Sequence, residues 1–430
     1  MRNASLWRAL LGVENTVIEA IEFSEVEDIV IAHVRPRRAA RGRCGRCGTR
    51  AAWYDHGEGR RRWRSLDLGT VEVFLEADAP RVNCPVHGPT VRHVPWARHA
   101  AGHTLSFDQQ VAWLATQCSK SAITQLMRIA WRTVGSIIAR VWADTAEGID
   151  AFAGLRRIGI DEISYKRNHK YLTVVVDHDT GRLVWAKAGR DRATLEEFFD
   201  ALEASGEGRC AQITHVTADG ADWIADVVRR RCPAAVRCAD PFHVVGWATD
   251  ALDAVRRDAW NQARRAGHTR PAGWQNGRAV TVATGHARAL KHARYALWKN
   301  PENLTDKQQT KLAWIAKTDP RLYRAYLLKE GLRTVFKLPA DEAAEALDRW
   351  VAWARRCRIA SFVKLQQRIT KHRAEILAAI DHGLSNGLIE SVNTKIRLIT
   401  RVAFGFRSPD ALIGLAMLNL GGNRPLLPGR

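Results

Sequence analysis

The sequence lacks any run of 18 consecutive apolar residues within its 430 residues. A helix needs about that length to cross the hydrocarbon core of a bilayer, so no membrane span is expected. The first residues, Met-Arg-Asn-Ala-Ser-Leu-Trp, also lack the apolar core of a signal peptide. Internal repeats, low-complexity tracts and long linkers are absent too. These absences predict a cytoplasmic protein with no membrane partner.

Acidic residues are scarce relative to basic ones. The chain has 45 Asp and Glu against 66 Lys and Arg, which gives a net charge of +21 and a pI of about 10.2. Residues 241–380 alone hold 26 basic and 12 acidic residues. A genome rich in G and C could explain the preference for Arg over Lys, but it does not explain the excess of base over acid. The balance favours a polyanionic partner, namely nucleic acid.

Eight cysteines are present, and in a cytoplasm they are expected to stay reduced. Cys44-Gly-Arg-Cys47 and Cys84-Pro-Val-His87 are two turn-like pairs, each followed by glycine. Together they offer three thiolates and one imidazole, the donor set of a closed structural zinc site. We therefore predict one structural Zn²⁺ in a small β-rich finger. His56 is an alternative ligand, but no such turn surrounds it.

Between these pairs lies the run Arg60-Arg-Arg-Trp-Arg64, in which Arg60, Arg61, Arg62 and Arg64 are suited to phosphate contact. An ordinary solvated run of charge would look the same. Further along, apolar spacing predicts helical pieces over 107–117, 121–129 and 133–142, with Ser119 or Ser121 as a cap. This pattern is typical of a helix-turn-helix whose third piece is the recognition helix, and it makes Arg132 and Arg140 candidate DNA contacts.

Two short apolar runs in the middle of the chain end at acid. The run from Leu155 ends at Asp161, and a strand-like run from Ile213 ends at Asp219. Strand-like segments over 171–177 and 183–188 and a helical stretch over 195–204 lie between them. Far downstream, Glu390 lies in an amphipathic helical run. This order of elements is that of an RNase H-like nucleotidyl-transferase core, in which three distant carboxylates hold divalent metals.

Carboxylates suit this chemistry because Mg²⁺ is a hard cation that prefers oxygen ligands. Two ions about 4 Å apart can activate an attacking oxygen and stabilise the leaving oxygen in an in-line displacement. We therefore predict that Asp161, Asp219 and Glu390 are catalytic and hold two Mg²⁺ or Mn²⁺ ions. Asp222 is a minor competitor of Asp219, which is preferred because it stands at the end of the strand.

Residues next to these carboxylates are candidates for supporting roles. Asp240 and His243 lie at a predicted strand–helix junction and could support the metal site or contact a DNA end, although Asp240 could equally be a helix cap. Glu390 and Asn393 share a helix face with Arg397 and Arg401, at spacings of three and four. Such a face suits metal and phosphate binding, so the two arginines join the candidate DNA contacts.

The fold class that follows is α+β with several domains. We expect an N-terminal β-rich zinc finger and a helix-turn-helix, then an RNase H-like α/β core interrupted by a large helical insertion. Arg256, Arg257, Arg264 and Arg265 make the insertion a candidate for non-specific DNA contact. The expected boundaries are 1–105 for the zinc-finger domain, 106–150 for the helix-turn-helix, 151–245 for the first part of the core, 246–380 for the insertion and 381–430 for the C-terminal part.

The chain resembles the ISL3 family of bacterial insertion-sequence transposases over nearly its whole length. The resemblance is carried by the Cys₃His residues, the helix-turn-helix, Gly159-Ile-Asp-Glu, Asp240-Pro-Phe-His and, most specifically, Asn386-Gly-Leu-Ile-Glu-Ser-Val-Asn with the later Arg-Val-Ala-Phe-Gly-Phe-Arg. It implies a DDE transposase with Asp161, Asp219 and Glu390 as its triad. The partners implied are double-stranded DNA, as terminal inverted repeats and target, and a second copy in a homodimer or larger assembly on the nucleoid.

Two other classes of protein share parts of this pattern. A structure-specific nuclease or resolvase could use the same core, but it has no evident need for a zinc finger and a helix-turn-helix. A DNA-binding regulator would need those two modules but not the carboxylates. Strand cleavage and joining on DNA with the element's own ends would separate the three.

Overall fold

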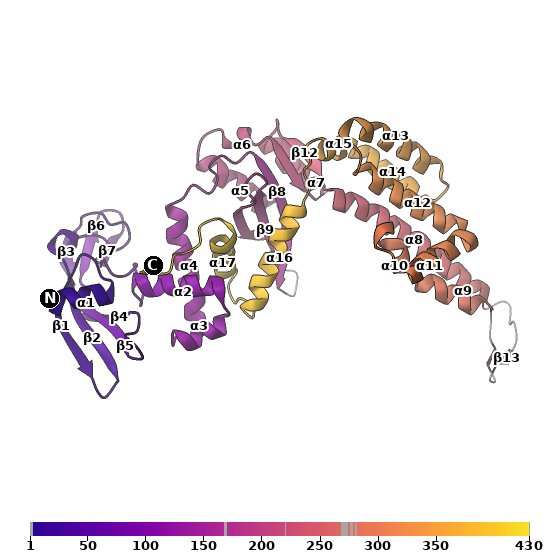
Figure 1. Ribbon diagram of the computed structural model, residues 1–430. Helices are drawn as coiled ribbons and strands as arrows, with labels where there is room; N and C mark the ends of the chain where they lie inside the picture. Colours follow the sequence, from indigo (N-terminus) through magenta and orange to yellow (C-terminus); the bar gives the residue numbers. More distant parts are fainter. Residues whose placement is uncertain are drawn as a thin grey trace. The chain divides into compact units, whose positions relative to one another are not determined.

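A computed structural model describes residues 3–429, apart from 167–169, 220, 268–273, 276–277 and 280–281. The chain divides into two compact units, one made of Met1–Ala151 with Lys395–Arg430 and the other of Phe152–Thr394 (Figure 1). The boundary between Thr394 and Lys395 falls inside a helix, which therefore belongs to both units. Within the described residues, no helix has the length and apolarity that a bilayer crossing requires.

The first unit begins with a β-rich region. Helix α1 (Asn3–Leu11) precedes β1 (Thr16–Ser24) and β2 (Ile29–Pro36), which form a sheet of order β1-β2-β5-β4 with β4 (Arg60–Arg64) and β5 (Glu72–Asp78). Only the β2–β5 pair of this sheet is parallel. Alternate residues of β5, including Val73 and Leu75, point into a core that also holds Trp63.

A smaller sheet of order β3-β6-β7 carries the two turns with cysteine. It consists of β3 (Ala52–Asp55), β6 (Arg81–Cys84) and β7 (Gly88–Val91), all paired antiparallel. Cys84 pairs with Gly88, so His87 lies in the tight turn between β6 and β7. The β-rich finger predicted from the sequence is confirmed, and a short 3-10 turn η1 (Arg38–Ala40) leads into it.

Three helices follow, as predicted for the helix-turn-helix. They are α2 (Leu105–Gln117), α3 (Lys120–Leu126) and α4 (Trp131–Glu147). Ser119 caps α3, because its side chain accepts a hydrogen bond from the Ala122 backbone N–H. Arg128 turns the chain between α3 and α4 with a left-handed backbone (φ 52°). The C-terminal helix α17 (Pro409–Leu420) packs against α4.

The second unit is built on a five-stranded sheet of order β10-β9-β8-β11-β12. The strands are β8 (Arg157–Lys166), β9 (Lys170–Asp177), β10 (Leu183–Ala188), β11 (His215–Ala218) and β12 (Val236–Ala239). The pairs β8–β9 and β9–β10 are antiparallel, whereas β8–β11 and β11–β12 are parallel. Helices α5 (Arg192–Ala204) and α7 (Asp222–Arg231) place apolar side chains in the core beneath the sheet, and the short α6 (Arg209–Gln212) precedes β11.

The position of Asp161 in β8 differs from the sequence prediction. We expected a strand that ends at this acid, but β8 continues to Lys166. The reason is the hairpin with β9, which pairs β8 from Ile158 to Lys166. Only the parallel pairing with β11 stops just before the acid, at Ile160. By contrast, Asp219 directly follows the last residue of β11, as predicted.

A helical segment follows β12 and has a hydrophobic core of its own (Figure 1). The first helix, α8 (Pro241–Gly267), is long and packs against α9, α12 and α14. The remaining described elements, in chain order, are β13 (Trp274–Gln275), β14 (Arg278–Ala279), α9 (Val282–Lys291), α10 (Arg294–Trp298), η2 (Pro301–Asn303), α11 (Asp306–Thr318), α12 (Pro320–Val335), α13 (Ala340–Arg356), α14 (Ala360–Lys371) and α15 (Arg373–Asp381). Trp350 is 4% exposed in this core, and Trp247, Trp260, Trp298 and Trp314 pack against it.

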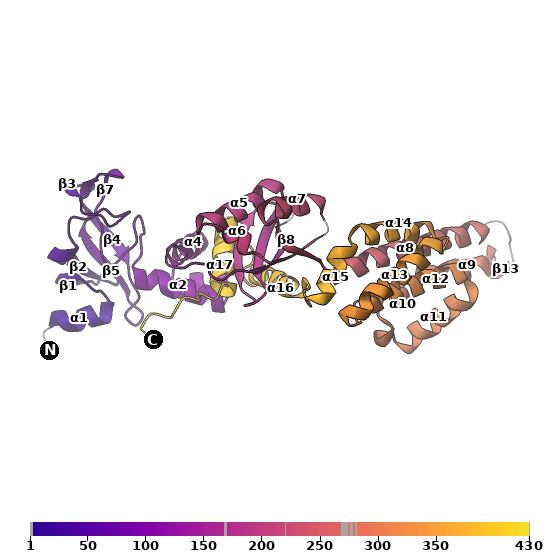
Figure 2. The same cartoon turned by 90° about the horizontal axis from the view of Figure 1, so that it is seen from above.

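Helix α16 (Gly387–Val402) begins on the second unit and carries Glu390. Its start lies on the face of the sheet opposite α5 and α7 (Figure 2). Gly159 of β8 permits this close approach: a Cβ at this position would lie 2.2 Å from Ile389 Cδ1 and 2.9 Å from His178 Nε2. Ile389 itself is fully buried. The glycine of the Gly159-Ile-Asp-Glu motif therefore sets how near the Glu390 helix can come to the strand of Asp161.

Substitution of Gly159 by Ala is expected to lower the free energy of unfolding by about 1–3 kcal/mol, because the added methyl group overpacks this contact. Ile389→Val removes the atom nearest to the new methyl group. The double variant should therefore lose less stability than the sum of the two single variants. Denaturant unfolding measures all three.

Gly246→Ala is a suitable control, because nothing lies within 4 Å of a Cβ at this position in α8. It should raise stability by about 0.5–1 kcal/mol through helix propensity. Strict additivity of Gly159→Ala and Ile389→Val would contradict the packing argument.

Candidate functional site

Three acids each follow the last residue that is paired in the parallel part of the sheet. Ala218 of β11 pairs with Ile160 of β8 on one side and with Ala239 of β12 on the other. The residues that follow Ile160, Ala218 and Ala239 are Asp161, Asp219 and Asp240, respectively. Neighbouring strands lie about 4.8 Å apart, so this register brings the backbones of three acids together. Residues that are 58 and 79 positions from Asp161 in the sequence thus become its neighbours.

Asp161 is held by two hydrogen bonds. Its Oδ1 accepts the backbone N–H of Glu162 at 2.7 Å, and its Oδ2 accepts Nδ2–H of Asn393 at 2.7 Å. Burial raises the pKa of Asp161, and the charges of Asp219 and Glu390 raise it further. Asp161 is therefore close enough to Asp219 and to Glu390 for the negative charge of each to oppose its ionisation.

Glu390 is exposed near the start of α16, one turn before the buried Asn393. The Asn393 side chain connects this helix to Asp161, and its Oδ1 is buried without a hydrogen-bond partner. A buried carbonyl oxygen without a partner, next to clustered carboxylates, fits the oxygen-rich shell of a hard divalent cation. Within the described residues, the three acids do not lie within 4.8 Å of one another as the zinc-type cluster below does.

Asp240 and His243 form a pair at the start of α8. His243 Nδ1 lies 2.9 Å from Asp240 Oδ2, and Asp240 Oδ1 accepts the backbone N–H of Asn386 at 3.1 Å. Burial alone would raise the pKa of Asp240, but the hydrogen bonds from His243 and Asn386 outweigh it and lower that pKa. The same hydrogen bond to Asp240 raises the pKa of His243, to which the charges of Asp219 and Asp161 also contribute. Asp240 does cap α8, and it also connects α8 with the chain just before Glu390.

Sequence reasoning missed Glu162, which follows Asp161 directly. Burial raises the pKa of Glu162, although the nearby Arg190 guanidinium lowers it through an ion pair. Arg190 in turn lies over the ring of Tyr171, 4.7 Å from its centroid. The only sequence signal was the adjacency of the two acids. Asp222, the competitor of Asp219, is exposed and forms an ion pair with Lys371 at 2.9 Å.

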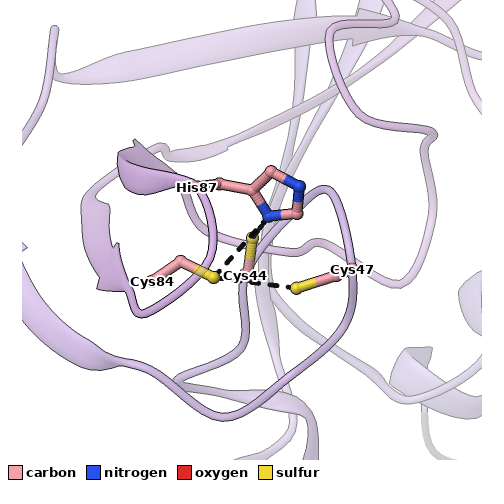
Figure 3. Close-up of side chains that lie close together, drawn as sticks. All are labelled: Cys44, Cys47, Cys84 and His87. Atoms are coloured by element: carbon pink, nitrogen blue, oxygen red, sulfur yellow. Dashed lines mark hydrogen bonds between the residues drawn. The ribbon is translucent and has the colours of Figure 1, made fainter.

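The second candidate site is the predicted zinc cluster. The ligand atoms of Cys44, Cys47, Cys84 and His87 all lie within 4.8 Å of one another (Figure 3). Cys47 Sγ lies 3.7 Å from Cys84 Sγ, and His87 Nδ1 lies 3.7 Å from the sulfurs of Cys44 and Cys84. Tetrahedral ligands at zinc distances are about 3.3–3.8 Å apart, so this donor set fits Zn²⁺. His56 is not part of the group.

Reduced thiols are consistent with this site, because all eight cysteines are free. Hydrogen bonds from Thr49 lower the pKa of Cys47 to about 6, which favours the thiolate that binds metal. Burial raises the pKa of Cys44, so this thiol gains most from a cation that stabilises its ionised form.

The arginine run on β4 is largely engaged within the protein. Arg60 and Arg62 both form ion pairs with Glu76 of β5, and Arg64 is 7% exposed beside Asp67 and Glu72. The Arg61 guanidinium donates to the Ala101 carbonyl and lies over Trp63. Alternation along the strand explains this outcome, because a strand next to acidic β5 places its cations opposite carboxylates. Contact of these four arginines with DNA stays a prediction.

The other predicted DNA contacts differ in how exposed their side chains are and in whether they bind acids within the protein. Arg140 binds the fully buried Asp108 through two hydrogen bonds, which fixes α4 on α2. Arg132 is exposed at the start of α4, the proposed recognition helix. Arg397 and Arg401 are exposed on α16. Sequence reasoning also missed Phe404, which is 75% exposed and has a left-handed backbone (φ 53°) just after α16.

The structure changes the expectation for the helical segment. Arg256 is 8% exposed and hydrogen-bonded to Asp253, which Arg257 also contacts. Arg264 lies over Trp260. Replacing all four predicted arginines would therefore perturb the helix as well as any DNA contact, and Arg256 in particular is a structural residue.

Replacement of Cys84 by Ser is expected to abolish zinc retention. The wild-type protein should purify with about one zinc per chain, because a closed Cys₃His site binds tightly, and the variant should hold almost none. Elemental analysis measures this ratio. Cys118→Ser is the matched control, since Cys118 lies outside the cluster and should leave the zinc content unchanged. A wild-type protein that holds no zinc would refute the assignment.

Replacement of Asp161 by Asn is expected to raise the stability of the metal-free protein at pH 7. Burial and neighbouring acids raise the pKa of Asp161, so its ionised form costs stability above that pKa and the cost disappears as the pH falls through it. The gain should therefore shrink on acidification. Unfolding by denaturant in a chelator measures it. Asp222→Asn should show no gain, because the hydrogen bond from Lys371 lowers the pKa of Asp222.

Comparison with known proteins gives three family matches in chain order. Residues 40–87 match the zinc-finger of transposase IS204/IS1001/IS1096/IS1165, residues 92–142 match the helix-turn-helix domain of transposase family ISL3, and residues 158–415 match a family described as transposase. The last match covers more than half of the chain.

Whole-chain relatives agree with these matches. The chain is 68% identical over 441 residues to the transposase for insertion sequence element IS1557 of Mycobacterium tuberculosis, covering 100% of this chain and 98% of that protein. It is 26% identical over 415 residues to the transposase for insertion sequence element IS1001 of Bordetella parapertussis, with 95% and 96% covered. A solved Drosophila P element transposase strand transfer complex has 10% identity and a TM-score of 0.36, over 75% of this chain and 93% of that one. The chain therefore belongs to the ISL3 family of insertion-sequence transposases, and it is an enzyme that acts on DNA.

Proposed function

We propose that this enzyme binds the terminal inverted repeats of its insertion sequence and catalyses Mg²⁺-dependent strand cleavage and strand transfer. The observation that supports this most directly is the strand register that sets Asp219 beside Asp161, with the Glu390 helix packed on the same strand at Gly159. A regulator that only binds DNA would have no use for a largely buried carboxylate, Asp161, whose ionisation two further acids oppose.

The sheet supports an RNase H-like core. Three antiparallel strands, β10, β9 and β8, are followed by the parallel β11 and β12, with helices on one face and α16 on the other. In this proposal residues 246–380 form an insertion between β12 and α16. The insertion has a hydrophobic core of its own, and it also packs against the sheet where α15 meets β12.

Asp161, Asp219 and Glu390 would hold the metal ions, and Asn393 would support them. Bound Mg²⁺ ions supply Lewis-acid stabilisation of the oxygens that gain charge during phosphodiester exchange. Asn393 fixes the orientation of Asp161 through the 2.7 Å hydrogen bond and leaves its own carbonyl oxygen facing no protein donor. Supporting residues of this kind typically contribute 10–100-fold to metal affinity or activity.

His243 is proposed to carry a positive charge beside the acids. The hydrogen bond to Asp240 and the negative charges of Asp219 and Asp161 raise its pKa, so the protonated imidazole is favoured. Such a cation can donate a hydrogen bond to a non-bridging phosphate oxygen of the bound strand. Asp240 would then position His243 and, through Asn386, the start of the Glu390 helix.

DNA recognition is proposed to involve the helix-turn-helix and the zinc finger. Arg132 at the exposed start of α4 is suited to the major groove, and the exposed Arg397 and Arg401 of α16 are suited to phosphate contact. Transposition joins two element ends, so a homodimer or larger assembly on DNA is proposed as the active form. We propose that it acts in the cytoplasm, on nucleoid DNA.

Asp161→Asn, Asp219→Asn and Glu390→Gln are each expected to reduce cleavage of a duplex that bears the element's own end by more than about 100-fold, beyond the loss typical of a supporting residue. Binding of the same duplex should stay within about twofold, because each change removes charge at nearly constant shape. Gel-based cleavage and fluorescence anisotropy measure the two quantities.

A second readout does not depend on catalysis. Mg²⁺ should raise the melting temperature of the wild-type protein, because a ligand that binds only the native state stabilises it, and it should do so less in each variant. Asp222→Asn is the matched control and should behave as wild type in both assays. Normal cleavage by any one of the three variants would remove that residue from the site.

A further inference from the structure

Phe404 lies in the turn that follows α16, and it is 75% exposed. Its backbone N–H donates a hydrogen bond to the Arg401 carbonyl at 3.0 Å. The next N–H, that of Gly405, donates to the Thr400 carbonyl at 2.8 Å. These two bonds form a Schellman motif, in which the residue at the position of Phe404 has a left-handed backbone. Phe404 takes that conformation with φ 53°.

Neither the turn nor the solvent accounts for a phenylalanine at this position. Glycine is the usual residue there, because a Cβ opposes the left-handed backbone. An exposed aromatic ring also leaves apolar surface in contact with water. Among the described residues other than glycine that have a positive φ, Phe404 is the one with an aromatic side chain. Backbone strain of this kind is concentrated at functional sites, so we looked for a role for the ring.

Phe406, two residues further on, fixes the turn to the helix-turn-helix. It is 8% exposed, and its ring centroid lies 4.3 Å from Nζ of Lys120, the first residue of α3. The same Nζ lies 4.9 Å from the ring centroid of Trp131, the first residue of α4. The exposed Arg132 follows directly. The turn that carries Phe404 is therefore held, through Lys120, to the start of the proposed recognition helix.

The chain around Phe404 is basic. Residues 391–409 contain no acidic residue and four basic ones, all of them exposed: Lys395, Arg397, Arg401 and Arg407. Among the residues that the structure describes, neither the Arg401 nor the Arg407 guanidinium forms an ion pair. Cations thus precede and follow the exposed ring by three residues each. DNA offers the matching chemistry, because it combines phosphates that bind guanidinium groups with flat bases on which aromatic rings stack.

We propose that Phe404 inserts its ring between two neighbouring bases of the DNA that the helix-turn-helix binds, while Arg401 and Arg407 contact phosphates beside it. This inference rests on the proposed binding of the element's ends. Apolar side chains such as Phe act as wedges that partly unstack a base step and bend the duplex. Unstacking costs least at flexible pyrimidine–purine steps. Phe404 would therefore favour such a step at the position that it reaches, without a hydrogen bond to any base.

A series of duplexes that bear the element's own end, with 2-aminopurine at successive positions, tests the proposal in the absence of Mg²⁺. The wild-type protein is expected to raise the fluorescence at one or two neighbouring positions, because 2-aminopurine fluoresces more strongly once it is unstacked. Phe404→Ala should abolish this rise and weaken binding of the unlabelled duplex about tenfold, within the range that stacking on one base contributes. Phe404→Trp should keep both properties, because its ring can also stack. Neither readout requires cleavage.

Phe404→Gly separates this role from a structural one. Glycine suits the left-handed backbone of the turn, and a ring that is 75% exposed contributes little packing. The melting temperature of this variant should therefore equal or exceed that of the wild-type protein, while its binding of the duplex weakens as in Phe404→Ala. A lower melting temperature with unchanged binding would make Phe404 a structural residue and overturn the proposal.

Phe23→Ala is the matched control. Phe23 is another exposed phenylalanine, at 55%, but it lies in β1 between Glu22 and Glu25, so its removal should change neither binding nor fluorescence. The proposal is overturned if Phe404→Ala keeps both the affinity and the fluorescence profile of the wild-type protein. It is also overturned if Phe404→Ala alters only the oligomeric state without DNA, which would assign the ring to a protein interface. A wild-type protein that does not bind the end duplex at all would contradict the proposed function as well.

Discussion

Repulsion between carboxylates that are held side by side is the constraint on which the central part of this enzyme depends. Asp161 and Asp219 stand next to each other because Ile160 and Ala218 pair in a parallel ladder, and Glu390 approaches because Gly159 lets Ile389 rest on the same strand. Sheet hydrogen bonds and buried apolar contacts supply the free energy that keeps these charges together. Among the described residues, His243 lies beside the acids and the Arg190 guanidinium forms an ion pair with Glu162.

Much of the fold could be predicted from local patterns, because the spacing of apolar residues indicates strands and helices. The strand that ends at Asp219, the helix-turn-helix pieces and the helical character of the segment before Glu390 all followed from this. The extent of β8 could not be predicted in this way. Its extension past Asp161 comes from pairing with β9, and the identity of a pairing strand leaves no local signal in the sequence. The engagement of Arg64 and Arg140 within the protein was hidden for the same reason, because Glu72 and Asp108, with which they form ion pairs, lie on other elements.

The candidate site was predicted in its residue types but not in its connections. Four metal-type ligands in two short turns were readable as a cluster, and they do converge. The three carboxylates were named from their positions in the element order, and their role stays a prediction. What the sequence could not supply are contacts between residues far apart in the chain. Asn393 with Asp161 and Asp240 with Asn386 span 232 and 146 residues, and a single sequence does not reveal such distant pairs.

The hydrogen bond from the Asn386 backbone to Asp240 has a consequence for how this enzyme can change. It joins the point where the chain leaves the sheet to the point where it returns, and the helical segment between them also contacts the sheet through α15 on β12 and the Arg237–Glu375 ion pair. The length of the insertion should then have little effect on the geometry of the acids, since the entropic cost of closing a loop grows only slowly with its length. Descendants of this chain could exchange, shorten or enlarge this helical segment, and with it any surface that the segment contacts, while the acids keep their spacing.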